Sequence, residues 1–208
     1  MKDKKNIIKV ISLLFLILII FFTIYYKTKN NGNNNIKSIN DLKEYILNIS
    51  SYEAELEVTV YSNKTTNKYK LMQLYCKPNF IKQVVKEPSN IENLTIIYDG
   101  NSIKIENTNL SLSKIYKDYK YINENTIWLN SFLDNYNYNS KNYETQNEYI
   151  FENYNDYNNY NVKQKLYIDK NKKVPIKMEI YDNNKNIKVY IKYNEIKLNK
   201  LTKKQILE

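Results

Sequence analysis

The chain has 208 residues and a formal net charge of +10, and it contains no His, no Arg, one Cys and two Gly. Without His there is no imidazole base or ligand, and a single Cys excludes an internal disulfide and a Cys-based zinc site. Two Gly cannot form a glycine-rich phosphate loop. We therefore expect no catalytic residue, no metal site and no cofactor, and we predict a binding protein rather than an enzyme.

Residues 10–26 form one long apolar run, VISLLFLILIIFFTIYY, which follows a Lys-rich segment over residues 1–9. At about 1.5 Å per residue, a helix of this length comes near the lower limit for crossing a membrane. A cleaved signal peptide, the alternative, needs small residues at its end, whereas this run ends in bulky ones. We predict a single-pass anchor in the cell membrane, with residues 1–9 in the cytoplasm and the C-terminal domain outside it.

The net charge is divided between two parts of the chain. Residues 1–29 carry +5, so the exported part also carries +5, which is ordinary for a domain of this size. The absence of Arg removes the side chain best suited to bidentate contacts with phosphates and guanine. We therefore expect no nucleic-acid partner.

A linker and a helix are predicted after the anchor. Residues 27–37 are rich in Asn, which favours a flexible linker. Ser38 fits the N-cap of the helix, and Asp41 in the first turn complements the helix dipole. Apolar residues recur at helical spacing, at Ile39, Leu42, Ile46 and Ile49.

The hydrophobic period then changes from helical to alternating, which predicts a half-buried antiparallel strand over residues 52–60. Its polar side carries Glu53, Glu55 and Glu57, which we interpret as a solvated face; a carboxylate enzyme is the alternative. Two alternatives are open for the segment that carries Leu110, Leu112 and Ile115: it continues the sheet as a further strand, or it crosses the face of the sheet. Further strands are predicted at residues 68–77, 80–87, 94–98, 102–106, 143–152, 162–168, 174–181 and 187–198.

Cys76 is a lone thiol in an exported domain. We interpret it as a small buried hydrophobic residue. The alternative is an intermolecular disulfide, which would make the protein a homodimer.

The spacing of apolar residues predicts a second helix over residues 125–136, and the apolar side of this helix carries Trp128 and Phe132. These two side chains are candidates for lining a hydrophobic cavity. Residues 134–161 follow with seven Tyr and ten Asn. Tyr offers rigid contact area with a polar tip, so Tyr154, Tyr157 and Tyr160 are candidate partner-binding residues. The alternative is a solvated loop whose composition reflects AT-rich codons.

The strands and two helices fit one exported α+β domain over residues 38–199, followed by a C-terminal tail at residues 200–208. Several short motifs occur in order along this domain: Lys77-Pro78, Lys82, Glu87-Pro88 and Asp99-Gly100, then a strand that begins near Pro175, an Asp182-Asn183 turn and a long last strand. This order resembles the LolA-like superfamily, and within it most resembles the GerS-type germination lipoproteins. The chain lacks a lipobox Cys, so it looks like a membrane-anchored relative.

The resemblance implies a curved antiparallel half-barrel sheet with helices packed on its concave face. It also implies a non-enzymatic accessory protein of spore germination and cortex modification, which binds and supports a cell-wall amidase. Two alternatives stay open: a lipid or lipoprotein-acyl carrier of LolA type, with Trp128 and Phe132 in its cavity, and an RseB-like sensor of envelope stress.

Overall fold

The computed structural model describes residues 18, 36, 38–119, 127–137, 139–154 and 163–207. The predicted cytoplasmic segment 1–9 lies outside these residues, as do the predicted anchor and linker, apart from Leu18 and Ile36. No helix in the described part of the chain is long and apolar enough to cross a membrane. The membrane anchor therefore stays a prediction.

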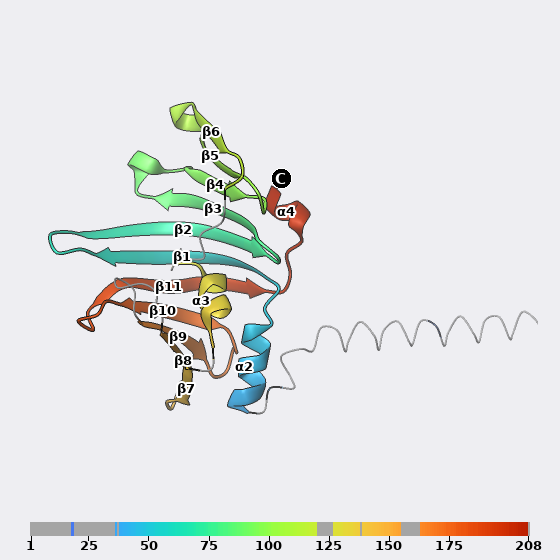
Figure 1. Ribbon diagram of the computed structural model, residues 1–208, viewed down its shortest axis with the longest axis vertical. Helices are drawn as coiled ribbons and strands as arrows, with labels where there is room; N and C mark the ends of the chain where they lie inside the picture. The colour runs from blue at the N-terminus through green and yellow to red at the C-terminus, as the bar shows by residue number, and fades with distance from the viewer. Residues whose placement is uncertain are drawn as a thin grey trace, which may run out of the picture.

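The described strands form one curved antiparallel sheet in the order β6-β5-β4-β3-β2-β1-β11-β10-β9-β8-β7 (Figure 1). One meander runs from β1 to β6 and another from β7 to β11, and they join where β1 pairs with β11. A mostly antiparallel sheet with few helices confirms the predicted class. The strands are β1 (Ser51–Tyr61), β2 (Thr66–Cys76), β3 (Phe80–Glu87), β4 (Thr95–Tyr98), β5 (Ile103–Asn107), β6 (Leu112–Tyr116), β7 (Lys141–Glu144), β8 (Glu148–Tyr154), β9 (Lys163–Asp169), β10 (Pro175–Tyr181) and β11 (Ile187–Leu198).

Strand β1 lies at the centre of the sheet and shows why the alternating sequence folds this way. Tyr52, Ala54, Leu56 and Val58 are buried in one continuous hydrophobic core. The intervening acids lie on the other face, where β1 pairs with the Lys-bearing strand β11. Successive residues of a strand point to opposite faces of the sheet. The alternation of apolar and acidic residues therefore determines which face of β1 packs against the core.

The helices are α2 (Ile39–Leu47), α3 (Leu129–Asn135) and α4 (Lys203–Leu207). The predicted cap of α2 is confirmed: Ser38 Oγ accepts from the Asp41 amide at 3.1 Å, and the Asp41 carboxylate accepts from the Ser38 amide at 2.9 Å. Figure 1 shows α3 in front of the middle of the sheet and α2 at the lower end of the sheet. Both helices contribute to the same core, α2 through Leu42 and α3 through Phe132.

The structure differs from the sequence-based prediction at three places, two in secondary structure and one in the burial of a side chain. The strand predicted at residues 143–152 is a hairpin, because Thr145 closes a turn in which its amide donates to the Glu148 carbonyl at 2.8 Å. The predicted tail contains α4, whose Ile206 is fully buried. Cys76 is free and partly exposed rather than buried, with its Sγ 3.5 Å from the Lys77 carbonyl oxygen.

Candidate protein-binding surfaces

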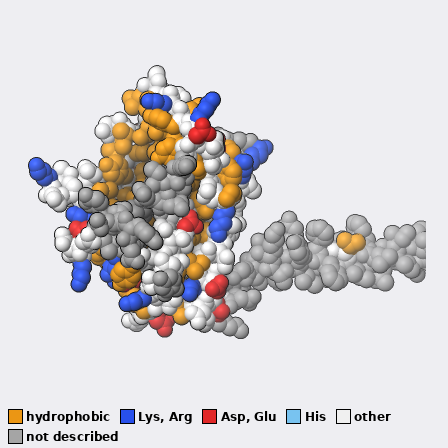
Figure 2. Space-filling view, viewed as in Figure 1, with side chains coloured by type: hydrophobic (Ala, Val, Ile, Leu, Met, Phe, Trp, Pro, Cys, Tyr) orange, Lys and Arg blue, Asp and Glu red, His pale blue; other side chains and the backbone are white. Residues whose placement is uncertain are grey.

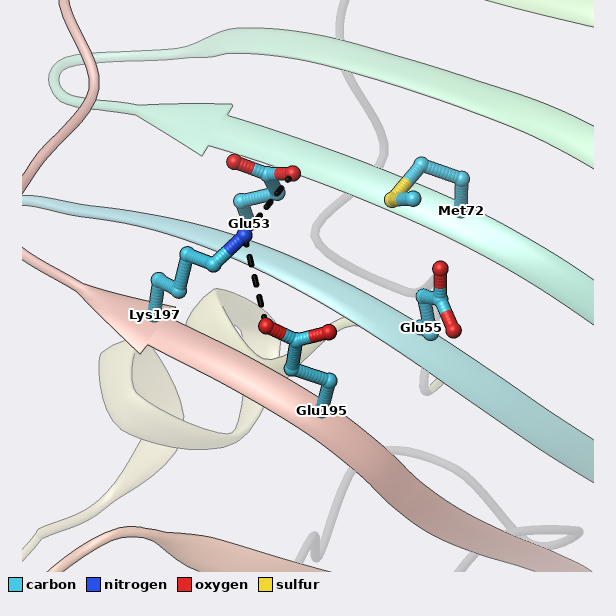
Figure 3. A pocket seen from close by; sticks show the side chains of 5 residues that line it. All are labelled: Glu53, Glu55, Met72, Glu195 and Lys197. Carbon is cyan, nitrogen blue, oxygen red and sulfur yellow. Dashed lines mark ion pairs between the residues drawn. The ribbon is translucent and has the colours of Figure 1, made fainter.

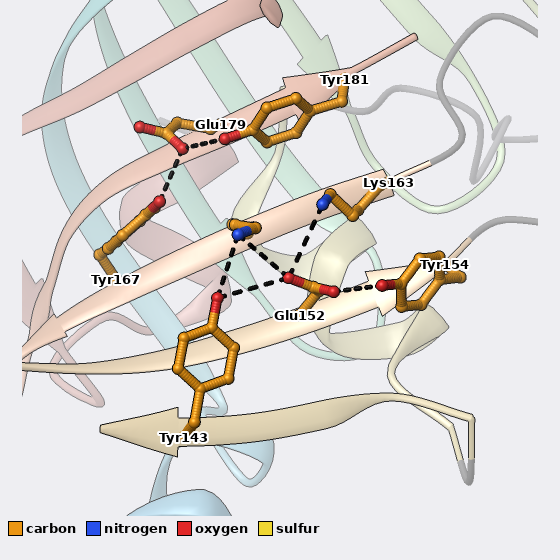
Figure 4. A network of polar contacts seen from close by, with 8 residues as sticks. Tyr143, Glu152, Tyr154, Lys163, Tyr167, Glu179 and Tyr181 are labelled. Carbon is orange, nitrogen blue, oxygen red and sulfur yellow. Dashed lines mark hydrogen bonds and ion pairs between the residues drawn. The ribbon is translucent and has the colours of Figure 1, made fainter. Parts of the chain in front are cut away.

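The outer face of β7–β10, opposite the core, is covered by a layer of polar side chains. Glu152 on β8 is at its centre and is only 7% exposed. Its carboxylate lies 3.2 Å from Lys165 Nζ and 3.8 Å from Lys163 Nζ, while Tyr143 and Tyr154 donate hydrogen bonds to it (Figure 4). The layer thus holds a carboxylate away from water between two ammonium groups and two phenols.

A second carboxylate of the same layer is Glu179 on β10. It accepts hydrogen bonds from Tyr167 at 2.7 Å and from Tyr181 at 2.5 Å (Figure 4). Burial, together with this carboxylate, raises the pKa of Tyr181 to about 12 and raises that of Tyr167 as well. Lys163 Nζ lies 4.9 Å from the centre of the Tyr181 ring, which adds a cation–π contact.

We call this surface the Tyr–Lys–Glu layer. The layer consists of Tyr143, Glu152, Tyr154, Lys163, Lys165, Tyr167, Glu179 and Tyr181. Each phenol of the layer donates to a fixed acceptor, the carboxylate of Glu152 or of Glu179. What the layer offers is therefore a rigid arrangement of phenol rings and ammonium groups, a composition suited to protein contacts.

Of the three predicted partner-binding Tyr residues, the structure describes only Tyr154. Tyr154 belongs to the Tyr–Lys–Glu layer through its hydrogen bond to Glu152. Tyr157 and Tyr160 lie outside the described residues, so their role stays a prediction. The layer itself could not be recognised from the sequence, because it depends on the pairing of β8, β9 and β10.

The layer makes stability depend on pH through Glu152. Burial raises the pKa of this carboxyl, but the hydrogen bond from Tyr154 and the positive charges of Lys165 and Lys163 outweigh burial and lower it below its ordinary value. A carboxyl with a lowered pKa stabilises the fold above its unfolded pKa, near 4.5, and this contribution is lost as the pH falls through the folded value.

We therefore expect Glu152→Gln to lose less stability than the wild type when the pH is lowered from about 6 to about 3, because the variant lacks this titration. Urea unfolding of the full chain at both pH values measures the difference. Glu144→Gln removes a more exposed carboxylate and serves as the control for the loss of one negative charge. An equal pH dependence in all three proteins would contradict the prediction.

The predicted cavity residues are part of the core. Trp128 is 3% exposed and Phe132 is fully buried. Phe132 borders an apolar crevice between α2 and α3, with Tyr136 and Phe151 among its walls, and the space inside it is too small for a water molecule. Ligand pockets usually measure about 300–1,000 Å³, so this crevice is small for an acyl chain. The cavity stays a prediction.

A shallow hollow lies over β1 and β11 on the outer face. Lys197 Nζ lies 3.7 Å from the Glu53 carboxylate and 3.3 Å from the Glu195 carboxylate, whereas Glu55 faces Met72 (Figure 3). The two carboxylates raise the pKa of Lys197 and keep it charged. Acids that are partly or fully exposed and paired with Lys agree with the predicted solvated face. No group of acids in the described residues is arranged to hold a metal ion.

The end of the sheet at β6 exposes apolar side chains. All five residues of this strand are exposed, and Leu110 in the preceding turn is 61% exposed. Ile115 is 57% exposed, and Leu112 and Tyr116 are each 42% exposed. Figure 2 shows hydrophobic side chains gathered over the upper part of the molecule, where Figure 1 places β4–β6. Contiguous exposed apolar side chains are typical of interaction sites.

Comparison with known proteins finds a family described as "Sporulation protein YdcC-like", whose profile matches residues 5–207. Comparison with curated protein sequences finds no match. A conserved protein from Thermus thermophilus is 10% identical with a TM-score of 0.52, and the likeness covers 81% of this chain and 90% of that chain. At this identity the likeness shows the fold alone.

Two further solved structures are similar. One is the CwlD amidase from Clostridioides difficile in complex with the GerS lipoprotein: 26% identity, TM-score 0.49, covering 75% of this chain and 91% of that chain. The other is a LolA superfamily protein from Nitrosomonas europaea: 13% identity, TM-score 0.44, covering 81% of this chain and 97% of that chain. The similar structures thus include both groups that the sequence motifs resemble.

Proposed function

The chain belongs to the YdcC-like family of sporulation proteins, and from this membership we propose that it is a membrane-anchored, non-enzymatic accessory protein that binds and supports a cell-wall amidase during formation of the spore cortex. The observation that carries the proposal is the extent of the family match. It spans residues 5–207 and so includes both the predicted anchor and the whole sheet.

The proposal that the partner is an amidase rests on the ordered motifs that resemble GerS-type proteins. The structure shows the role of one of these motifs, Asp99-Gly100. Asp99 Oδ1 accepts from the amides of Asn101 and Ser102 at 2.9 and 2.7 Å, and Gly100 has φ +98°. These contacts stabilise the β4–β5 hairpin, and a positive φ is accommodated best by Gly. This motif therefore supports the fold.

Two surfaces support a binding role. The Tyr–Lys–Glu layer presents ordered phenols and ammonium groups at one end of the sheet, and β6 presents apolar side chains at the other end. A lipid carrier would need a deeper apolar cavity than the crevice beside Phe132, so we keep protein binding as the single proposal.

Cells that lack the chain are expected to form spores whose cortex peptidoglycan lacks the products of the amidase. Muropeptide analysis of purified spores measures these products. Restoring the full chain should restore them, whereas restoring a chain without residues 1–26 should restore them less, because that chain would not be held at the membrane. Unchanged muropeptides in the deletion strain would contradict the proposed function.

A further inference from the structure

The two edges of the sheet are protected to different degrees. Strand β7 is four residues long, and its Glu144 pairs with Lys170 at 2.9 Å. Charged side chains on a short strand are the usual protection against pairing with another chain. Strand β6 carries three large apolar side chains and one Lys, and all of its residues are exposed. An edge of this kind is suited to pairing with an added strand.

The register of β6 shows which residues an added strand would meet. Tyr116 lies opposite Ile103, which packs against the core, so Leu112, Lys114 and Tyr116 share the core-facing side of the sheet. The opposite side carries Ser113 and Ile115. Residues directly opposite each other on neighbouring strands lie on the same face, so a partner strand must match an apolar–Lys–apolar row.

Charge decides what kind of strand fits. Lys114 Nζ lies 4.9 Å from the centre of the Tyr116 ring and makes no ion pair within the described residues. In contrast, Lys104 on β5 is paired with Glu106 at 2.5 Å. An acidic side chain opposite Lys114 would gain a cross-strand ion pair without breaking an existing one.

A second copy of the chain is a poorer occupant. Antiparallel pairing of two β6 strands over their full length places Lys114 opposite Lys114, because Lys114 is the central residue of the strand. Like charges directly opposite each other destabilise a strand pair. The exposed edge is therefore better matched by a different, acidic segment than by itself.

We propose that β6 binds an extended segment of the partner protein that adds a strand to the sheet, with an acidic residue opposite Lys114 and apolar residues opposite Leu112 and Tyr116. The partner segment therefore has the pattern apolar–x–Asp/Glu–x–apolar. This inference rests on the proposed function only for the identity of the partner, because the edge and its charge are properties of the chain itself.

The test uses the full chain in mild detergent and two labelled peptides, Thr-Val-Thr-Glu-Thr-Val-Thr and the same peptide with Lys in place of Glu. Fluorescence anisotropy should show that the wild type binds the Glu peptide about fivefold more tightly than the Lys peptide. Lys114→Glu should reverse this preference. Lys172→Glu, in the turn between β9 and β10, makes the same charge change elsewhere and should keep the wild-type preference.

Hydrogen exchange should locate the bound Glu peptide through slower exchange of the amides of residues 112–116. An unchanged preference in Lys114→Glu, or slower exchange at β7 instead, would overturn the inference. A chain that dimerises through β6 and binds neither peptide would overturn it too. Equal capture of the amidase by the wild type and Lys114→Glu would reject β6 as the binding edge but keep the proposed function. Charge-dependent peptide binding without any capture of the amidase would keep β6 as a binding edge but reject the amidase as the partner.

Discussion

Replacing Phe132 with Ala is expected to lower the free energy of unfolding by about 3–5 kcal/mol. Phe132 is fully buried, and its ring lies 5.9 Å from the ring of Tyr136 within the core shared by α2, α3 and the sheet. Truncation removes apolar contacts and leaves a cavity that the strands around it cannot fill. This is the largest effect that we expect from a single substitution. Whole domains are stable by only about 5–15 kcal/mol, so the loss is a large part of the total stability.

Urea unfolding of the full chain, followed by the fluorescence of Trp128, measures the change, since Trp128 is the only Trp in the sequence. Leu110→Ala is the matched control, because Leu110 is exposed and its truncation should cost no more than about 0.5 kcal/mol. If Phe132→Ala were as stable as the control and lost binding of acyl amphiphiles, Phe132 would line a lipid cavity rather than stabilise the core.

The second large effect is expected from replacing both Tyr167 and Tyr181 with Phe. Glu179 is 9% exposed and accepts hydrogen bonds from these two phenols. Hydrogen bonds to charged groups contribute about 1.5–3 kcal/mol each, so the double variant should lose about 3 kcal/mol or more. The loss arises because a buried carboxylate is left without these donors.

Adding Glu179→Leu to the double variant should recover a large part of this loss, because the uncompensated charge is then absent. Chemical unfolding of the wild type, the double variant and the triple variant provides the comparison. The exposed pair of Lys70 and Glu87, 2.7 Å apart, supplies a control: Glu87→Gln should leave stability close to that of the wild type, because solvent screens the pair. A double variant as stable as the wild type would show that the Tyr–Lys–Glu layer does not stabilise the sheet.

The features that the sequence predicted correctly are those encoded by neighbouring residues. The alternation in β1 predicted a half-buried strand, and Ser38 with Asp41 predicted the cap of α2, because each signal lies within a few positions. The β7–β8 hairpin was missed because its turn contains no Gly or Pro, the usual signals of a turn. The helix α4 was missed because it is only five residues long.

Surfaces that depend on strand pairing could not be predicted in this way. Glu152 and Lys165 are too far apart in the sequence for a helical or strand period to place them side by side. They meet only because β8 pairs with β9 in the observed register. A similar limit applies to Trp128 and Phe132. An apolar helix face predicts burial, but the same pattern serves a filled core and an open cavity, and the structure places both side chains in the core.

Binding of a cell-wall amidase is the central feature of the proposed function, and affinity capture tests it most directly. The full chain, tagged at its C-terminus, is extracted from sporulating cells in mild detergent, and the bound proteins are identified by mass spectrometry. We predict that an N-acetylmuramoyl-type amidase is recovered with the tagged chain in amounts well above those obtained with an unrelated tagged membrane protein. Recovery of no amidase, under conditions where the tagged chain itself is folded and restores the spore cortex in cells lacking the native chain, would contradict the account.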